Sequence, residues 1–313
     1  MSGFDLLVLG DINPDVLVSG VGEPVFGQAE TLVADARSVV GGSGAIMACA
    51  AAKLGLRTAI VGVVGDDAAG RMLLFALSES GVDVGGCIVD PSISTGMSVI
   101  LSRGDDRAIL TARGTTAALR AGDIDPTLLA NARHVHASHF FLQEALAPDL
   151  PAIFERARDA GASTSVDPNW DPAATWDGGL REVLEQTSCL FVNETEARKI
   201  SGAPDAEAAA KLLSAAGSVA DNVVVVKLGR DGALARRGEE LVRQQAQRSS
   251  IVDTTGAGDT FDAGFLAGYL QGWPLERCLA LAVTCGSLST RALGGTEAQP
   301  SLEEAVAEVE KLG

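Results

Sequence analysis

The stretch IVDTTGAGDTFDAGF, residues 251–265, says the most about the fold and chemistry of this chain. Aromatic side chains recur every four residues from Phe261 to Tyr269, which predicts a helix that begins between Gly256 and Asp259. A glycine-rich turn then forms the amino end of the helix, where unpaired N–H groups and the positive end of the helix dipole can hold an anion. The stretch therefore predicts a phosphate cradle with a carboxylate at its edge that could accept a proton from an attacking hydroxyl.

Short apolar runs alternate with helical segments along the rest of the chain. The runs are continuous, as expected for buried strands of a parallel sheet, and lie at residues 4–11, 57–67, 133–140, 162–169, 188–194 and 222–229. Helical segments at 70–81, 150–161 and 206–217 each end in a glycine suited to a left-handed C-cap. This order predicts an α/β fold: a doubly wound, mostly parallel Rossmann-like sheet with helices on both faces.

Polar side chains follow several of the apolar runs. They are Asp11, Asp66, Asp167, Asn169 and Asn193. Because ligands of doubly wound sheets bind outside the carboxyl ends of the strands, we expect these groups to converge on the site.

Two segments, residues 12–38 and 94–112, break the α/β rhythm. The second reads as two strands around a Gly-Asp-Asp turn. We expect the two segments to form a small separate β layer that acts as a lid, inserted in a single domain of residues 1–313. Ordinary edge strands of the main sheet are the alternative.

The amino-acid composition limits the classes of partner that the protein can bind. Lys and Arg total 24 against 41 Asp and Glu, a net charge of −17 that argues against nucleic acid and anionic membranes as partners and otherwise favours solubility. The five cysteines show no CxxC spacing, and no apolar run approaches the roughly 20 residues of a membrane span. We therefore expect a cytoplasmic protein with a small-molecule substrate.

The three histidines lie close together in HVHASH, residues 134–139. His134 and His136 could chelate zinc, but no third ligand is evident and Zn²⁺ needs three or four. A structural role at a strand end near the pocket is favoured.

Five motifs in this order resemble the ribokinase-like family of carbohydrate and nucleoside kinases, also called the phosphofructokinase-B family. They are GDINPD (10–15), GGSGAIMACAAAKLG (41–55), NETE (193–196), KLGRDG (227–232) and DTTGAGDTF (253–261). The resemblance covers essentially the whole chain. It implies a Rossmann-like domain with a small β-sheet lid, and a homodimer formed through the lid. The activity that it implies is the ATP- and Mg²⁺-dependent transfer of a phosphoryl group to a hydroxymethyl group of a small neutral sugar or polyol.

The resemblance also implies roles at the phosphate cradle. Asp259 would be the general base, and the N–H groups of Gly256, Ala257 and Gly258 would stabilise charge on the transferred phosphoryl group. Asp253 and Thr255 resemble a monovalent-cation site that some family members use, which suggests K⁺.

For the nucleotide, the resemblance implies that Asn193 and Glu196 organise Mg²⁺ and its waters. A helix cap is a compatible alternative for this pair, and a glycosylation acceptor is disfavoured by the lack of a signal peptide. Lys227, with Gly229 and Gly232, would lie against the nucleotide, and Ser287 would form part of the adenine pocket.

For the acceptor, Asn13 and Asp15 match residues that bind sugar hydroxyls, and Gly41 and Gly42 match glycines that let the acceptor approach the backbone. Ser43 stands where ribokinases commonly have Lys, and Ile46 stands where they have Asn, which disfavours ribose itself.

Trp170 and Asp171 lie near the place where the related fructokinases and ketodeoxygluconate kinases often carry Arg, so an acidic sugar is also less expected.

Three other functions are weighed against a sugar kinase. A nucleoside kinase is disfavoured because the lid segments hold no aromatic residue except Phe26. A catalytically silent sugar sensor would not need Asp259, Asn193 and Glu196. A dinucleotide oxidoreductase is disfavoured because no strand is followed by GxGxxG.

Overall fold

The computed structural model describes residues 3–23, 26–27, 30–103, 106–247 and 251–311. Its main sheet has eight strands. In spatial order they are β14 (Glu240–Gln244), β13 (Ala233–Arg237), β12 (Val223–Lys227), β11 (Cys189–Asn193), β10 (Ser163–Asp167), β9 (His134–Ser138), β1 (Leu6–Leu9) and β4 (Thr58–Val61). The strands from β12 to β4 are parallel, and only β13 and β14 pair antiparallel, which confirms the predicted doubly wound, mostly parallel sheet.

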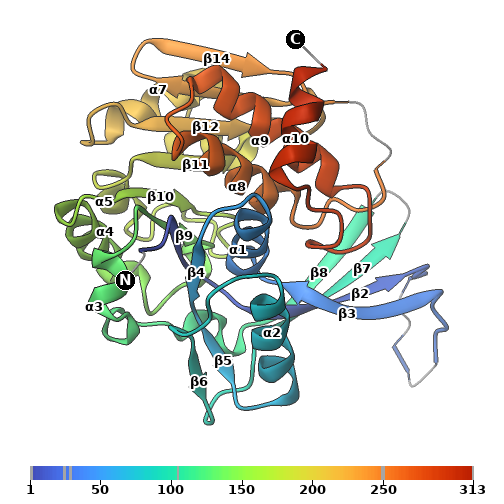
Figure 1. Cartoon of the computed structure of the whole chain (residues 1–313). Helices are drawn as coiled ribbons and strands as arrows, with labels where there is room; N and C mark the ends of the chain where they lie inside the picture. The colour runs from blue at the N-terminus through green and yellow to red at the C-terminus, as the bar shows by residue number, and fades with distance from the viewer. Residues whose placement is uncertain (1–2, 24–25, 28–29, 104–105, 248–250, 312–313) are drawn as a thin grey trace.

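Helices cover both faces of this sheet (Figure 1). One face packs against α1 (Ser43–Lys53), α2 (Ala68–Glu79), α8 (Ala257–Tyr269), α9 (Leu275–Ser289) and α10 (Leu302–Glu310). The other packs against α3 (Pro126–Ala130), α4 (Leu150–Asp159), α5 (Leu180–Leu184), α6 (Glu194–Ser201) and α7 (Ala206–Ala216). In β1, Leu6 and Val8 enter the first core while Leu7 and Leu9 enter the second. Burial on both sides explains why the strands are continuous apolar runs.

The prediction of a left-handed glycine after the helix is confirmed at two of the three helix ends. Gly81 after α2 has φ +83° and Gly161 after α4 has φ +92°. Gly217 after α7 is extended instead, at φ −79° and ψ 143°. The side chain of Asn222 donates to the Ser214 carbonyl at 2.9 Å and so takes over the capping of this helix.

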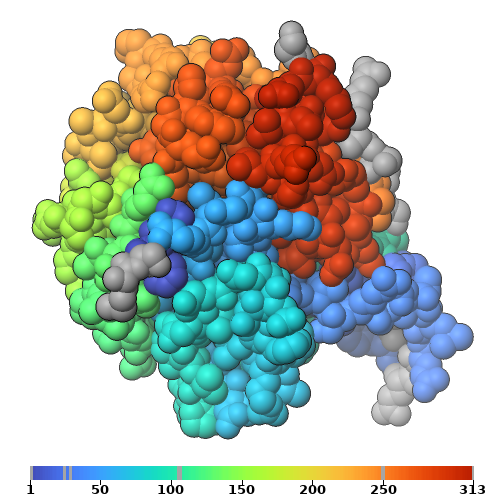
Figure 2. Space-filling model, in the orientation of Figure 1, coloured from blue at the N-terminus to red at the C-terminus, as the bar shows by residue number. Residues whose placement is uncertain are grey.

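The two irregular segments contribute a separate four-stranded sheet, hereafter the small sheet, rather than edge strands of the main sheet. Its order is β3 (Asp35–Gly41), β2 (Asn13–Ser19), β7 (Met97–Arg103) and β8 (Asp106–Ala112). Figures 1 and 2 show β2 and β3 projecting from the α/β body. Residues 24–25, 28–29 and 104–105 of the expected lid segments lie outside the described part of the chain.

A third sheet corrects one expectation about the strand ends. β5 (Val63–Gly65) pairs only with β6 (Ile88–Asp90), apart from the main sheet. Asp66, which follows β5, is exposed and forms an ion pair with Arg71 at 2.8 Å. It therefore does not join the other strand-end polar groups, because its strand has left the main sheet.

Within the described residues, none of the helices combines the length and apolar character that crossing a membrane would require.

Candidate active site

The glycine-rich turn starts α8 as the sequence predicts. Gly256 is the N-cap in a left-handed conformation, with φ +70° and ψ 6°. A Cβ at this position would lie 2.7 Å from Cγ2 of Ile46 and 2.9 Å from Cα of Gly295, so only glycine fits. Ala257 and Gly258 begin the helix, where N–H groups have no partner one turn back within the helix. The Ala257 N–H donates to the Thr254 carbonyl of the preceding turn at 3.3 Å. Ile46, which replaces the expected Asn, packs under this turn.

Asp259 lies in the first turn of α8 and faces a hydroxyl instead of a cation. The Ser43 hydroxyl donates a hydrogen bond to Oδ1 of Asp259. Nδ2 of Asn169 in turn donates to the Ser43 oxygen at 3.0 Å, so the hydroxyl is oriented from the far side. Burial raises the pKa of Asp259 to about 7, although the Ser43 hydrogen bond opposes the rise. A carboxylate with a pKa near 7 suits general-base catalysis at neutral pH.

Asp259 opens on a cavity of about 620 Å³, hereafter the acceptor cavity. Three buried polar side chains of its lining, hereafter the polar floor, are Asp11 (3% exposed), Asn13 (4%) and Asp15 (6%). Nδ2 of Asn13 donates to Oδ1 of Asp15 at 3.3 Å. The structure thus brings the predicted acceptor residues Asn13 and Asp15 to the same cavity as Ser43 and Asp259.

The paired glycines beside the floor make room for its side chains. A Cβ on Gly41 would lie 2.2 Å from Cγ of Asp15. Gly42, which has φ +85°, would place a Cβ 2.9 Å from Oδ1 of Asn13. Both positions need glycine, because any larger residue would push these two polar side chains away.

A histidine and an aspartate complete the cavity. The sequence predicted that Asp11 would reach the site, but it gave His139 no role in binding or catalysis. Nδ1 of His139 lies 3.1 Å from Oδ2 of Asp11, whose Oδ1 accepts from the Gly44 N–H at 3.0 Å. Burial lowers the pKa of His139, but the carboxylates of Asp11, Asp259 and Asp167 together outweigh burial and raise it above its ordinary value. His139 has left-handed backbone angles, φ 56° and ψ 44°. The strand-end position of Asp11 was readable from the sequence, whereas this backbone conformation was not.

Behind the cradle lies a buried set of charges, hereafter the charge cluster, made of Lys227, Asp167, Asp262 and Glu196. Nζ of Lys227 lies 2.6 Å from Asp167 and 3.1 Å from Asp262. A Cβ on Gly258 would be 3.4 Å from this ammonium, so the positive charge sits directly beside the cradle. Burial lowers the pKa of Lys227, but the surrounding carboxylates outweigh it and raise the pKa above its usual value. The predicted contact of Lys227 with the nucleotide stays a prediction.

Asn193 and Glu196 form a capping box at the start of α6. Glu196 accepts from the Asn193 N–H at 2.8 Å, and the Glu196 N–H donates to Oδ1 of Asn193 at 2.9 Å. Burial and the nearby Asp167 charge raise the pKa of Glu196 to about 7. Each oxygen of the Glu196 carboxylate accepts one hydrogen bond from Asn193, which leaves lone pairs that could hold metal-bound water. The pair fits the predicted Mg²⁺ role without testing it.

Asp253 ties the turn before α8 to a neighbouring loop. Its side chain accepts from the Thr255 N–H at 2.9 Å and from the Gly294 N–H at 2.9 Å. These bonds hold the turn in place, and the monovalent-cation role of Asp253 and Thr255 stays a prediction.

The remaining residues predicted for the nucleotide lie outside the acceptor cavity. Gly229 and Gly232 flank the turn between β12 and β13, with φ +60° and +90°. A Cβ on Gly232 would lie 1.9 Å from the Gln244 carbonyl, so the close approach of β14 requires glycine. Ser287 lies on α9, where the adjacent Gly286 allows close packing against Ala257 and Phe261 of α8.

The paired histidines are structural. His134 and His136 are buried on β9 and bond to the hydroxyls of Ser163 and Ser165 at 2.6–2.7 Å. Burial lowers the pKa of both to about 3, so both are neutral. In the described residues no group of three metal-ligating side chains occurs.

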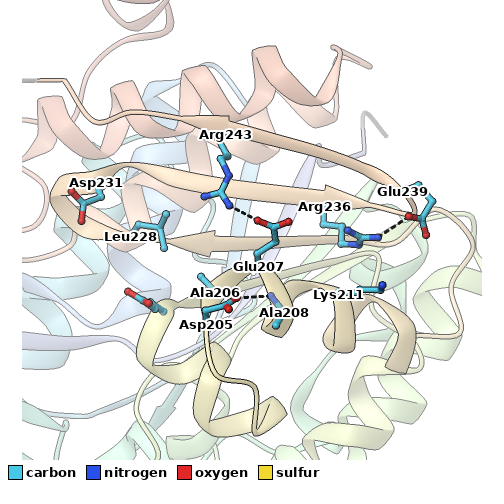
Figure 3. Close-up of a pocket in the computed structure, with 11 residues that line it drawn as sticks. Asp205, Ala206, Glu207, Ala208, Lys211, Leu228, Asp231, Arg236, Glu239 and Arg243 are labelled. Carbon is cyan, nitrogen blue, oxygen red and sulfur yellow. Dashed lines mark hydrogen bonds and ion pairs between the residues drawn. The ribbon is translucent and has the colours of Figure 1, made fainter.

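A second concavity, of about 660 Å³, lies between α7 and the β13–β14 hairpin (Figure 3). Both of its arginines are engaged in ion pairs: Arg243 pairs with Glu207, and Arg236 pairs with Glu239. It lacks the buried polar floor and the carboxylate at a helix N-terminus that mark the acceptor cavity. The slightly smaller acceptor cavity is therefore the candidate active site.

Comparisons with known proteins agree with this geometry. The profile of the pfkB family of carbohydrate kinases matches residues 5–302. This chain belongs to the pfkB carbohydrate kinase family. An ATP-dependent ribose-1-phosphate kinase from Halopiger xanaduensis is 31% identical over 299 residues, which cover 94% of each chain.

Solved structures of pfkB relatives show the same fold. A putative ribokinase II from E. coli, in complex with ATP and Mg²⁺, has a TM-score of 0.85 and 25% identity, and the match covers 98% of this chain and 99% of that one. Ribokinase from Arabidopsis thaliana, complexed with ribose and ATP, has a TM-score of 0.83 and 24% identity over 98% of this chain and 99% of that one. The fold and family that the five motifs imply are thus confirmed, and the chain is a sugar or nucleoside kinase of the pfkB family.

Proposed function

We propose that this kinase transfers the γ-phosphoryl group of ATP to a hydroxymethyl group of a small neutral sugar or related polyol. The observation that carries the proposal is the place of Asp259. Its carboxylate lies in the first turn of α8, beside the cradle N–H groups, and opens on a cavity with a polar floor. Carboxylates with a raised pKa that lie at a cavity are concentrated at functional sites.

The chemistry follows from this placement. The acceptor oxygen attacks the γ-phosphorus, the bond to the bridging oxygen of ADP breaks, and Asp259 takes the hydroxyl proton. The N–H groups of Gly256, Ala257 and Gly258 bind the charge on the transferred group, and the Lys227 ammonium beside them adds a fixed positive potential.

ATP and Mg²⁺ are the proposed cofactors. Bound Mg²⁺ would neutralise phosphate charge, and the Asn193–Glu196 pair would hold its waters. Lys227, Gly229, Gly232 and Ser287 would border the nucleotide, and a K⁺ requirement at Asp253 and Thr255 belongs to the same proposal.

The polar floor favours a neutral polyol. Carboxylate and amide side chains of Asn13 and Asp15 match vicinal hydroxyls, whereas the carboxylates of Asp11, Asp15 and Asp259 repel an acidic acceptor. A nucleoside kinase of the same family would use the same steps on the sugar hydroxyl.

The proposal is tested by measuring ATP consumption over hexoses, pentoses, polyols and nucleosides, with Asp259→Asn as the inactive control. We expect turnover with at least one neutral acceptor that depends on Asp259. Activity only with acidic sugars, or equal activity in the control, would contradict it.

We further propose that the small sheet is a lid over the acceptor. Ser98, Ile100 and Thr111 of this sheet line the acceptor cavity. Exclusion of water suppresses transfer to solvent. Hydrogen exchange in residues 12–38 and 94–112 should slow when acceptor is added, and unchanged exchange in both segments would remove the lid role.

The outer side of the same sheet suits a second copy of the chain. The strand registers place Val16, Val99 and Leu110 opposite one another, on the face away from the cavity, and Leu110 is 60% exposed. We propose a homodimer through this face. Leu110→Glu should shift the mass measured by light scattering to that of a monomer, while Leu212→Glu, at a 53% exposed position on α7, should not.

A cytoplasmic setting is proposed as well, because all five cysteines are free thiols.

A further inference from the structure

The acceptor cavity changes character from its floor to its mouth. Its polar floor residues are at most 6% exposed, whereas Trp170 is 56% exposed and Ile109 of the small sheet is 53% exposed. Leu142 and Pro172 add further apolar surface to the lining. A small polyol that fills the floor leaves this apolar mouth facing water.

Trp170 is held in place by its own loop. The buried Asp171 side chain accepts hydrogen bonds from the backbone N–H groups of Ala173 (2.8 Å), Thr175 (2.7 Å) and Trp176 (2.6 Å). Asp171 is 3% exposed and does not line the cavity, so it fixes the loop rather than binding the acceptor.

A series of aromatic rings supports the indole from behind. The rings of Trp170 and Trp176 are perpendicular, with centroids 5.0 Å apart. Trp176 is 8% exposed and contacts Phe141 edge to face at 6.0 Å. Phe141 in turn contacts the buried Phe140 at 5.3 Å. The exposed indole is therefore a rigid surface on a packed base, which costs little entropy to use in binding.

We infer that Trp170 is a specificity-determining residue that stacks against a planar ring carried by the acceptor, at the end remote from the hydroxyl that receives phosphate. The inference rests on the proposed phosphoryl transfer to a hydroxymethyl group, and it favours the nucleoside alternative named there over a free sugar. A cavity of about 620 Å³ lies well inside the range of about 300–1,000 Å³ for drug-sized ligands. The acceptor class that combines polyol hydroxyls with a flat, weakly polar ring is the nucleoside. The aromatic surface missing from the lid segments comes from the loop that carries Trp170, while Phe26 of the lid segment is 98% exposed.

The kinetic test compares ribose with cytidine, uridine, adenosine and guanosine in wild type, Trp170→Ala and Trp170→Phe. We expect at least one nucleoside to have a KM about tenfold or more below that of ribose. Trp170→Ala should raise that KM by roughly 5- to 150-fold, the range for stacking on one base, with kcat within about threefold. Trp170→Phe should keep most of the affinity, and KM for ribose should change less than about threefold. A lower KM for ribose than for every nucleoside, or an equal KM increase for both classes, would overturn the inference.

A binding measurement separates this inference from the kinase proposal. The chain has three tryptophans, and Trp273 lies elsewhere, under the Arg277 guanidinium at 3.8 Å. Without ATP, a nucleoside should quench the fluorescence of wild type and Trp273→Phe, and this quench should be lost in Trp170→Phe. If no acceptor is phosphorylated but the quench appears, the kinase proposal fails and the stacking role stands. Quenching that is unchanged in Trp170→Phe, or absent from wild type with all four nucleosides, would overturn the stacking role.

Discussion

Helix α8 carries two aspartates three residues apart that end in different regions. Asp259 lies at the acceptor cavity with a hydroxyl partner from Ser43, while Asp262 is 1% exposed and lies against the Lys227 ammonium in the charge cluster. Burial and the neighbouring Asp167 carboxylate raise the pKa of Asp262 well above its ordinary value, although Lys227 opposes the rise. The proton of Asp262 is therefore held inside the cluster at neutral pH, whereas Asp259, with a pKa of about 7, can take a proton at the cavity. The comparison of these two aspartates shows that the surroundings of a carboxylate, and not the residue type, decide whether it can act as a general base.

The largest stability effect is expected when the charge cluster is broken. Lys227→Met leaves Asp167 and Asp262 buried without their cation and should lower the free energy of unfolding by about 3–5 kcal/mol, measured by urea denaturation. The surface pair of Arg237 and Glu240 is the control, and Arg237→Met should cost about 0–1 kcal/mol. An equal loss of unfolding free energy in the two variants would show that the charge cluster does not stabilise the fold more than a surface ion pair does.

The Mg²⁺ dependence of activity tests whether Glu196, a member of the charge cluster, also acts in the reaction. Glu196→Gln retains a side chain that can accept the cap bond, but it removes the charge that would hold metal-bound water. The Mg²⁺ concentration for half-maximal activity should rise about 10-fold or more. Asp205→Asn, at the N-cap of α7, is the matched control and should leave it unchanged. An unchanged Mg²⁺ response in Glu196→Gln would return Asn193 and Glu196 to helix capping alone.

The pH dependence tests which carboxylate acts as the base. Asp259 must be ionised to accept a proton, so kcat/KM should fall about tenfold per pH unit below its pKa of about 7 and level off above it. Glu196 has a pKa of about 7 as well. The profile should therefore persist in Glu196→Gln. A flat profile in that variant would assign the titration to Glu196.

The smallest effect concerns Ser43. Its hydrogen bond lowers the pKa of Asp259, so Ser43→Ala should move the midpoint of the pH profile upward. Activity should then drop a few-fold at pH 6.5 and much less at pH 8.5. An equal loss at both values would mean that Ser43 positions the acceptor without tuning the base.

Much of the fold was readable because burial on both faces leaves a simple pattern. The apolar runs became neighbouring strands, and the aromatic spacing after Asp259 marked α8 correctly. The predictions for Asp66 and Gly217 were wrong for local reasons. Asp66 follows β5, which pairs with β6 outside the main sheet, and the side chain of Asn222 caps the helix end where Gly217 was expected to be left-handed.

The sequence predicted residues of the site only where they belong to one of the five motifs or follow an apolar run. Asn13, Asp15, Ser43 and Asp259 all line one cavity, and their roles there stay predictions. No local sequence pattern predicts the left-handed backbone of His139 or the hydrogen bonds that keep Asp171 away from the cavity, because both depend on tertiary contacts.

The central claim is that Asp259 takes the acceptor proton, and kcat of Asp259→Asn tests it most directly. Asn is nearly isosteric but cannot accept the proton, so kcat should fall by about 10²–10⁴ while ATP binding persists. The raised pKa means that ionisation of Asp259 opposes folding as pH rises from about 4 to about 7. The variant should therefore melt at the same temperature as wild type or higher at pH 8. A variant that melts as expected yet turns over near the wild-type rate would contradict the assignment of Asp259 as the base.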